Sequence, residues 1–176
     1  LLRDQIQNGF DIISLVPSCV LMFKQELPLL FSENEALKEI KNRIYDPFEY
    51  LVMREKGDLL KKDFQKSLGK IAYQISCHQR VQNIGPVTKN ILEMIPDTEV
   101  ETIERCSGHD GTYALKKETY NNSKKIVNRV VKKVDSTQAD YLTSDCPLAG
   151  EHIKNFSAIK LDNVHPISLL RKAYNL

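Results

Sequence analysis

The sequence predicts an α/β protein in which a mainly parallel sheet is covered by helices. From about residue 70 to the end, short apolar segments alternate with helical patterns, which is typical of parallel strands joined by helical crossovers. In addition, each of the four cysteines follows a short apolar segment. We therefore expect the cysteines at the carboxyl-terminal ends of strands, the edge where α/β proteins usually bind ligands.

The first half of the chain predicts one strand, a group of helices and a connector. Pro28 should disturb the first helical run, because proline has no amide hydrogen for a helix interior. Apolar residues at steps of three and four predict a pair of helices further on, with a break near Asp46 and Pro47. The expected elements are a strand at 12–16, a helical run at 20–31, the helix pair between 36 and 52, and a solvated lysine-rich connection at 61–66.

The second half predicts four strands and four helices in strict alternation. The last helix should start at Pro166, since a proline in the first turn leaves no amide hydrogen unpaired. The expected strands are 70–76, 99–105, 139–145 and 158–164, and the expected helices are 86–95, 116–134, 149–156 and 166–174.

Composition narrows the class of protein. A chain of 176 residues with 41% hydrophobic residues can bury one core. The 25 basic and 23 acidic residues are well mixed, without the basic stripe that follows a phosphate backbone, so we expect no nucleic-acid partner. No apolar run reaches the roughly 18 residues of a membrane span, and no secretory signal is visible. These features predict a cytoplasmic protein.

The four cysteines are interpreted as reduced thiols. They are spread over the whole chain, unlike the dense cysteines of secreted disulfide scaffolds, and none forms a Cys-x-x-Cys pair. Spacing alone leaves structural and functional cysteines equally open. Cys106 lies in a turn with Gly108 and Gly111, and a turn with exposed amides can stabilise thiolates, the form that binds metal or attacks.

An internal repetition connects the two halves of the chain. Residues 10–24 share the layout of residues 139–154, in which an aspartate is followed by a strand, a turn with a cysteine and a helix. In this alignment Val16 corresponds to Cys146 and Cys19 to Ala149, which together mark the two ends of a Cys-x-x-Cys. We therefore expect residues 1–69 to be the tail of one repeat with a helical connector, and residues 70–176 to be a second repeat.

Several motifs in one order resemble a known family. The chain is similar to the carboxyl-terminal half of the cysteine-rich (CCG-repeat) iron-sulfur proteins, which include the C subunit of anaerobic glycerol-3-phosphate dehydrogenase and the iron-sulfur oxidoreductases related to heterodisulfide reductase. The resemblance covers nearly all 176 residues. The motifs are Val16-Pro17-Ser18-Cys19, Cys77-His78, Cys106-Ser107-Gly108-His109-Asp110-Gly111, Asp145-Cys146-Pro147-Leu148 and His165-Pro166.

The resemblance implies two cysteine-rich repeats, preceded by a ferredoxin-like region that this sequence does not contain, so we expect a part of a longer protein. In such proteins the cysteines hold an iron-sulfur cluster, or zinc in some repeats. Electrons pass between a dehydrogenase or other redox partner subunit and a quinone or a membrane-associated acceptor. By position, Cys77, Cys106 and Cys146 are the metal ligands of the second repeat, and Cys19 is the last cysteine of the first.

The sequence departs from the family pattern at three positions. Ser107 and Ala149 stand where the family has cysteines, and Gln74 stands where it usually has a histidine. Three cysteines with a fourth ligand can still bind an ordinary cluster or zinc. His78 and His109 are the candidates for that fourth position, or for hydrogen-bond donors to a ligand.

Three functions remain open at this point. The leading hypothesis is an iron-sulfur electron-transfer subunit of an oxidoreductase complex, with a cluster of the 4Fe-4S type. Such a subunit would be cytoplasmic and would reach the membrane surface through its partners. The second is a zinc-binding or metal-free interaction module that has lost the cluster. The third is a thiol redox protein, with Cys106 as a nucleophile activated by His109.

Overall fold

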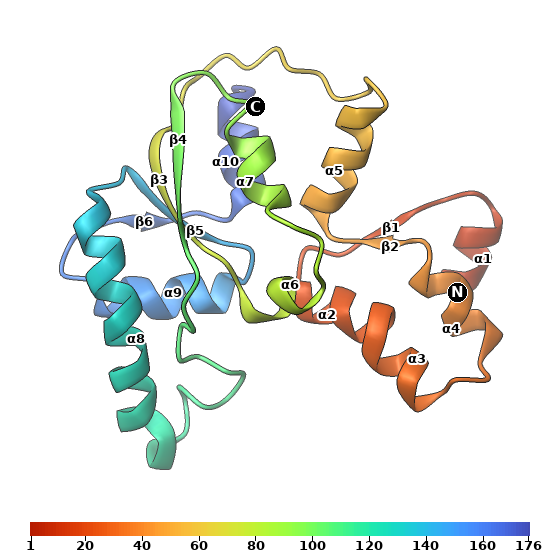
Figure 1. Cartoon of the computed structure of the whole chain (residues 1–176), viewed down its shortest axis with the longest axis horizontal. Coiled ribbons are helices and arrows are strands. Elements are labelled where there is room, and N and C mark those ends of the chain that lie inside the picture. Colours follow the sequence, from red (N-terminus) through yellow and green to blue (C-terminus); the bar gives the residue numbers. More distant parts are fainter. The chain divides into compact units, whose positions relative to one another are not determined.

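The computed structural model describes residues 1–176, which form two compact units (Figure 1). The first unit comprises Leu1–Leu60 and His78–Val87, and the second comprises Lys61–Cys77 and Thr88–Leu176. The assignment of residues 1–69 and 70–176 to two cysteine-rich repeats stays a prediction.

A four-stranded parallel sheet forms the centre of the second unit, in the order β4-β3-β5-β6. Its parallel strands confirm the predicted α/β fold, and each of the four expected strands is present but shorter than predicted. The strands are β3 (Gly69–Gln74), β4 (Thr98–Ile103), β5 (Tyr141–Ser144) and β6 (Asp162–Asn163).

Helices cover this sheet on both faces (Figure 1). The predicted helices are all present, and a short helix directly after β3, which begins at Cys77, was not predicted. The helices of the second unit are α7 (Val87–Leu92), α8 (Lys117–Thr137), α9 (Pro147–Phe156) and α10 (Pro166–Ala173), whereas α6 (Cys77–Val81) belongs to the first unit except for Cys77.

The main core lies between the sheet and helices α8 and α9. Val127, Val130 and Val134 recur along α8 at steps of three and four, so they share one face of the helix. They pack with Leu142 of β5 and Ile153 of α9, and all five side chains are fully buried. This packing holds the strands in register and thereby positions the loops that follow them.

The first unit has a smaller framework of two short parallel strands and helices. β1 is shorter than the predicted strand because Pro17 already starts the next helix, and β2 occupies the break predicted near Pro47. Helix α1 was not predicted. The elements are α1 (Leu2–Gln7), β1 (Ile12–Ile13), α2 (Pro17–Leu21), η1 (Met22–Glu26), α3 (Leu27–Leu30), α4 (Glu35–Lys41), β2 (Ile44–Tyr45) and α5 (Pro47–Lys56).

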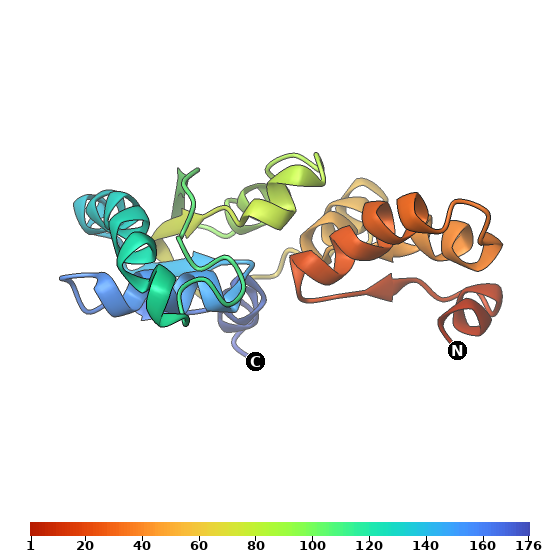
Figure 2. The same cartoon turned by 90° about the horizontal axis from the view of Figure 1, so that it is seen from below.

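The disturbance expected at Pro28 takes the form of a π-helical stretch. The elements α2, η1 and α3 follow one another without a break and form one continuous helical segment (Figure 2). Pro28 stands in the first turn of α3, directly after η1. A wider turn before the proline accommodates its missing amide hydrogen without ending the helix.

Candidate functional site

Three cysteines lie at one edge of the parallel sheet in the second unit. Gln74 at the end of β3 pairs with Ile103 of β4 on one side and with Ser144 of β5 on the other. Cys77, Cys106 and Cys146 follow these three neighbouring strands, each within three residues of that row. Because the strands are parallel, the predicted placement of these cysteines at the carboxyl edge is present in the structure.

All three cysteines are outside any disulfide, and their surroundings differ. Cys77 is the first residue of α6 and is exposed, and Cys106 is exposed in the turn after β4. Cys146 is half-buried and is the N-cap residue of α9, with Pro147 as the first helical residue. Two of the three thiols are therefore accessible to a metal ion or a reagent from solvent.

The turn at Cys106 is built around Gly108. Its φ of +75° is unfavourable for other residues, and a Cβ atom at this position would lie 2.8 Å from the backbone oxygen of Ser123. The amide N–H of Gly108 donates to Cys106 Sγ at 3.4 Å. Hydrogen bonds to sulfur are among the features that tune protein-bound iron-sulfur clusters. Gly111, the other glycine of the predicted binding loop, has a φ of +59° and open space around it.

A buried hydrogen-bond chain supports this turn from below. Ser123 Oγ of α8 donates to the carbonyl oxygen of Gly108 at 2.6 Å and lies 2.9 Å from Nε2 of His152 in α9. Since the hydroxyl proton is used for Gly108, we assign the proton of His152 to Nε2, which donates to Ser123. Burial and the neighbouring His109 lower the pKa of His152, which keeps this ring neutral. His152 therefore packs against His109 and Phe156 and supports Ser123 by a hydrogen bond.

The two histidines proposed as a fourth ligand differ in placement. His109 is 9% exposed and packs edge-to-face on His152, with ring centroids 5.9 Å apart. The hydroxyl of Ser107, which replaces a family cysteine, accepts a hydrogen bond from the amide of His109 at 3.4 Å. His78 is exposed and belongs to the first unit. Of the two, His109 is the one that lies in the same unit as the three cysteines.

A second buried cluster lies directly before Cys146. The carboxylate of Asp145 accepts hydrogen bonds from the hydroxyl of Tyr73 and from Thr88 Oγ1, the latter at 2.9 Å. Asp145 is 3% exposed and Tyr73 is 1% exposed. No sequence pattern indicates this cluster, since its members are far apart in the chain. These hydrogen bonds join Asp145, the residue before Cys146, to β3 and α7.

The donors are present, but they do not form a closed ligand set. No group of three or more His, Cys, Asp or Glu side chains in residues 1–176 is close enough to hold a metal ion. Three thiols at one edge have the donor chemistry of an iron-sulfur or zinc site. Ser76, beside Cys77, has a buried hydroxyl without a hydrogen-bond partner. The donor types therefore fit such a group, whereas their present arrangement does not.

Cys19, the fourth predicted ligand, lies in the first unit. It is exposed and sits one turn into α2, whose N-cap is Val16. This places Cys19 at the same step of its helix as Ala149 in α9, in agreement with the internal alignment of the sequence. Its predicted role as a ligand stays a prediction.

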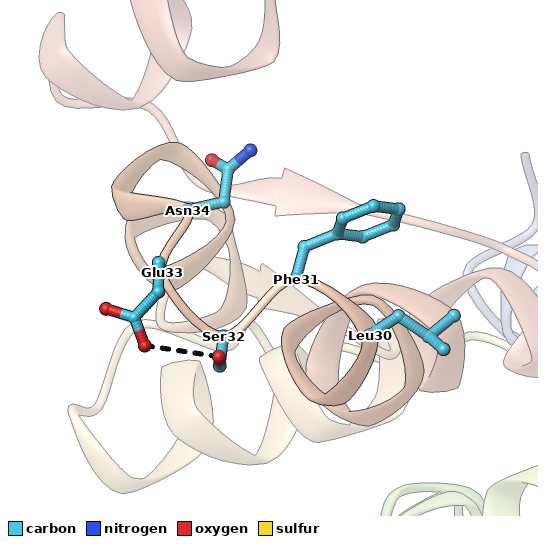
Figure 3. Close-up of a pocket in the computed structure, with 5 residues that line it drawn as sticks. All are labelled: Leu30, Phe31, Ser32, Glu33 and Asn34. Carbon is cyan, nitrogen blue, oxygen red and sulfur yellow. Dashed lines mark hydrogen bonds between the residues drawn. The ribbon is translucent and has the colours of Figure 1, made fainter.

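A surface pocket in the first unit has a different character. It lies at the end of α3, where Glu33 accepts a hydrogen bond from Ser32 at 3.2 Å (Figure 3). Its other lining residues are Leu30, Phe31 and Asn34. Because none of its lining residues is a cysteine or histidine, it is not a candidate thiolate site.

Comparison with known proteins identifies similar sequences. Residues 71–154 match the family model of the cysteine-rich domain called CCG. The chain is also similar to the C subunit of the anaerobic glycerol-3-phosphate dehydrogenase of Escherichia coli K12 and to that of E. coli O157:H7. Each is 25% identical over 174 residues, which cover 94% of this chain and 41% of the relative. The chain thus spans less than half the length of these relatives.

No helix of the structure combines the length and apolar composition needed to cross a membrane.

The matched segment, 71–154, runs from β3 to α9 and contains Cys77, Cys106 and Cys146. The comparisons therefore confirm the resemblance predicted from the sequence: residues 71–154 match the model of the CCG cysteine-rich domain, and most of the chain is similar to a subunit of a dehydrogenase.

Proposed function

We propose that this chain is an electron-transfer subunit of an oxidoreductase complex and binds an iron-sulfur cluster of the 4Fe-4S type. One observation carries the proposal. Three cysteines that form no disulfide follow three neighbouring parallel strands, inside the segment that matches the cysteine-rich domain. A shared edge is where an α/β fold brings distant residues to one ligand.

Cys77, Cys106 and Cys146 are the proposed ligands. Because no three donors converge in the present arrangement, binding requires at least one cysteine side chain to change its orientation. The exposed positions of Cys77 and Cys106 allow this movement without disturbing the core. Cys19, His78 and His109 are the candidates for a fourth ligand. When bound, the cluster would supply one-electron transfer.

The partner follows from the relatives. They are named as a subunit of a dehydrogenase, so we propose a dehydrogenase or other redox partner subunit for this chain as well. The acceptor we propose is a quinone or another membrane-associated acceptor. The protein would then work in the cytoplasm and reach the membrane surface through its partners.

Metal and sulfide analysis of protein made and purified without oxygen tests this function. Wild-type protein should contain iron and acid-labile sulfide and show broad visible absorption that bleaches on reduction. Cys77→Ser, Cys106→Ser and Cys146→Ser should each lose most of the iron. Cys19→Ser, measured in parallel, shows whether the fourth predicted cysteine contributes.

Two results would contradict the proposal. Zinc without iron in anaerobically purified protein would favour the zinc-binding interaction module, for which the serine at position 107 and the alanine at position 149 are the specific argument. A wild-type chain without any bound metal would exclude both forms of metal binding.

A further inference from the structure

We propose that Gln74 is a positioning residue that holds all three cysteine-bearing turns of the second unit in place. The purpose of this arrangement rests on the proposed function, whereas the arrangement itself is a property of the metal-free chain. The proposal concerns a residue that does not touch the ligand but acts through the backbone next to Cys77, Cys106 and Cys146.

The position of Gln74 in the sheet makes this possible. It is the last residue of β3, which lies between β4 and β5 in the sheet. Its direct neighbours across the sheet are Ile103 and Ser144. The residue is 1% exposed, so its amide group lies inside the protein, below the turns that carry the cysteines.

The amide nitrogen of Gln74 bonds to two strand ends. Nε2 donates to the carbonyl oxygen of Ile75 at 2.7 Å and to that of Arg105 at 2.9 Å. Ile75 lies two residues before Cys77, and Arg105 immediately precedes Cys106. Both hydrogens of the side-chain amide are therefore used to hold backbone carbonyls beside cysteines.

The amide oxygen reaches the third turn through one serine. Ser144 Oγ donates to Gln74 Oε1 at 2.8 Å and accepts a hydrogen bond from the backbone amide of Cys146 at 3.3 Å. Ser144 is 1% exposed. A single buried side chain thus bonds, directly or through one hydroxyl, to the backbone at or beside each of the three cysteines.

The chemistry of glutamine suits this position better than the histidine that the family resemblance predicts there. A neutral imidazole offers one donor and one acceptor, so it cannot donate to two carbonyl oxygens and also accept from Ser144. Glutamine can do all three. An apolar side chain of similar length would leave two carbonyls and a hydroxyl without their partner in a buried site.

Amide hydrogen exchange of the metal-free full chain tests the proposal. Gln74→Met keeps the length of the side chain and removes its hydrogen bonds. Exchange should become at least about tenfold faster in the segments 75–77, 105–108 and 144–147 together, because local opening frees these amides. Exchange in α8 should stay unchanged. Ser144→Ala should accelerate exchange in 144–147 only.

Thr143→Val is the matched control. It removes a buried hydroxyl from the neighbouring position of the same strand, but this hydroxyl donates to the carbonyl oxygen of Val164, away from the cysteine turns. We expect all three cysteine segments to exchange as in the wild type. If Gln74→Met fails to fold, Ser144→Ala and Thr143→Val still test the proposal. They compare the loss of the Ser144 bonds to Gln74 and Cys146 with the loss of the Thr143 bond to Val164.

The results can overturn the proposal without reference to metal. Acceleration spread evenly over the whole second unit in Gln74→Met would show a merely structural role. Unchanged exchange in 105–108 and 144–147, or equal effects of Ser144→Ala and Thr143→Val on 144–147, would also contradict it. Iron content is measured separately, so a wild-type chain without iron would refute the proposed function and leave the exchange result valid.

Discussion

The junctions β1–α2 and β5–α9 have the same local construction in two different surroundings. In the first, the amide of Val16 donates to Ser14 Oγ at 3.5 Å, and in the second, the amide of Cys146 donates to Ser144 Oγ at 3.3 Å. A proline is the first helical residue of α2 and of α9. Both turns thus share a serine two residues before the N-cap and a proline directly after it, two residue types that favour such a turn.

The surroundings decide what each junction can do. β1 pairs only with β2, and Ile13 in β1 and Leu15 just after it are 46% and 56% exposed. β5 lies between β3 and β6, and its residues Leu142 and Ser144 are almost fully buried. Local sequence therefore forms the turn, whereas bonds from distant strands hold the cysteine of the second junction in place.

The largest contrast concerns the strands themselves. Leu142 is fully buried in the core of the second unit, and Leu142→Ala should lower the free energy of unfolding of this unit by about 2–5 kcal/mol. Ile12 occupies the equivalent place in β1 and is only half-buried, so Ile12→Ala should cost about 1 kcal/mol. Urea unfolding, monitored in each unit by hydrogen exchange, measures the change in the free energy of unfolding for both variants. Equal costs would contradict the comparison.

The turn at Cys106 has no counterpart in the first unit, and Gly108→Ala should disturb it alone. The positive φ and the close backbone oxygen of Ser123 together should cost about 1–3 kcal/mol. Gly111→Ala is the control, because its positive φ is similar but no atom lies within 4 Å of the added methyl group. A melting temperature lowered equally by both variants would show that conformational strain alone matters, without the close approach.

The helices that follow β2 and β6 differ in their N-caps. Asp46 is 1% exposed and accepts from the amides of Phe48 and Glu49, so Asp46→Ala should destabilise α5 by about 1–2 kcal/mol. The side chain of His165 accepts a bond of 3.3 Å from the amide of Ile167, and His165→Ala should cost about 0.5 kcal/mol. Thermal unfolding compares the two, and a larger effect of His165→Ala would be against this reasoning.

The smallest difference is expected between the two serines. Ser144→Ala removes two buried hydrogen bonds, one to the side chain of Gln74 and one from the amide of Cys146. It should lower the free energy of unfolding by about 1 kcal/mol. Ser14→Ala removes one long, exposed bond and should change stability by less than about 0.5 kcal/mol. Chemical denaturation of both variants measures this pair, and a cost for Ser14→Ala as large as for Ser144→Ala would mean that burial does not distinguish the junctions.

Much of the fold was predictable because its signals are local. Apolar periodicity predicted the parallel strands and the helices of the second unit, and Pro166 predicted the start of α10. The two-residue strand β2 was missed, since so short a segment has no period, and α1 and α6 were missed as well. The placement of the cysteines at strand ends was also predictable, because each follows an apolar segment.

The hydrogen bonds that hold the cysteine-bearing turns could not be predicted from the sequence. Gln74 was noted only as a departure from the family pattern, whereas its importance depends on bonds to residues 31 and 70 positions away. The bond between Ser123 and His152 depends equally on the packing of α8 against α9. The only local signal was the serine two residues before Cys146, which a search for turn-forming serines could have found.

The most direct test of the central claim is the iron and labile sulfide content of anaerobically purified wild-type protein beside Cys106→Ser. We expect iron and sulfide in the wild type, and loss of most of both in the variant, with the same circular dichroism spectrum. Equal iron in the two proteins, or none in the wild type, would contradict the account of a cluster bound at this edge of the sheet.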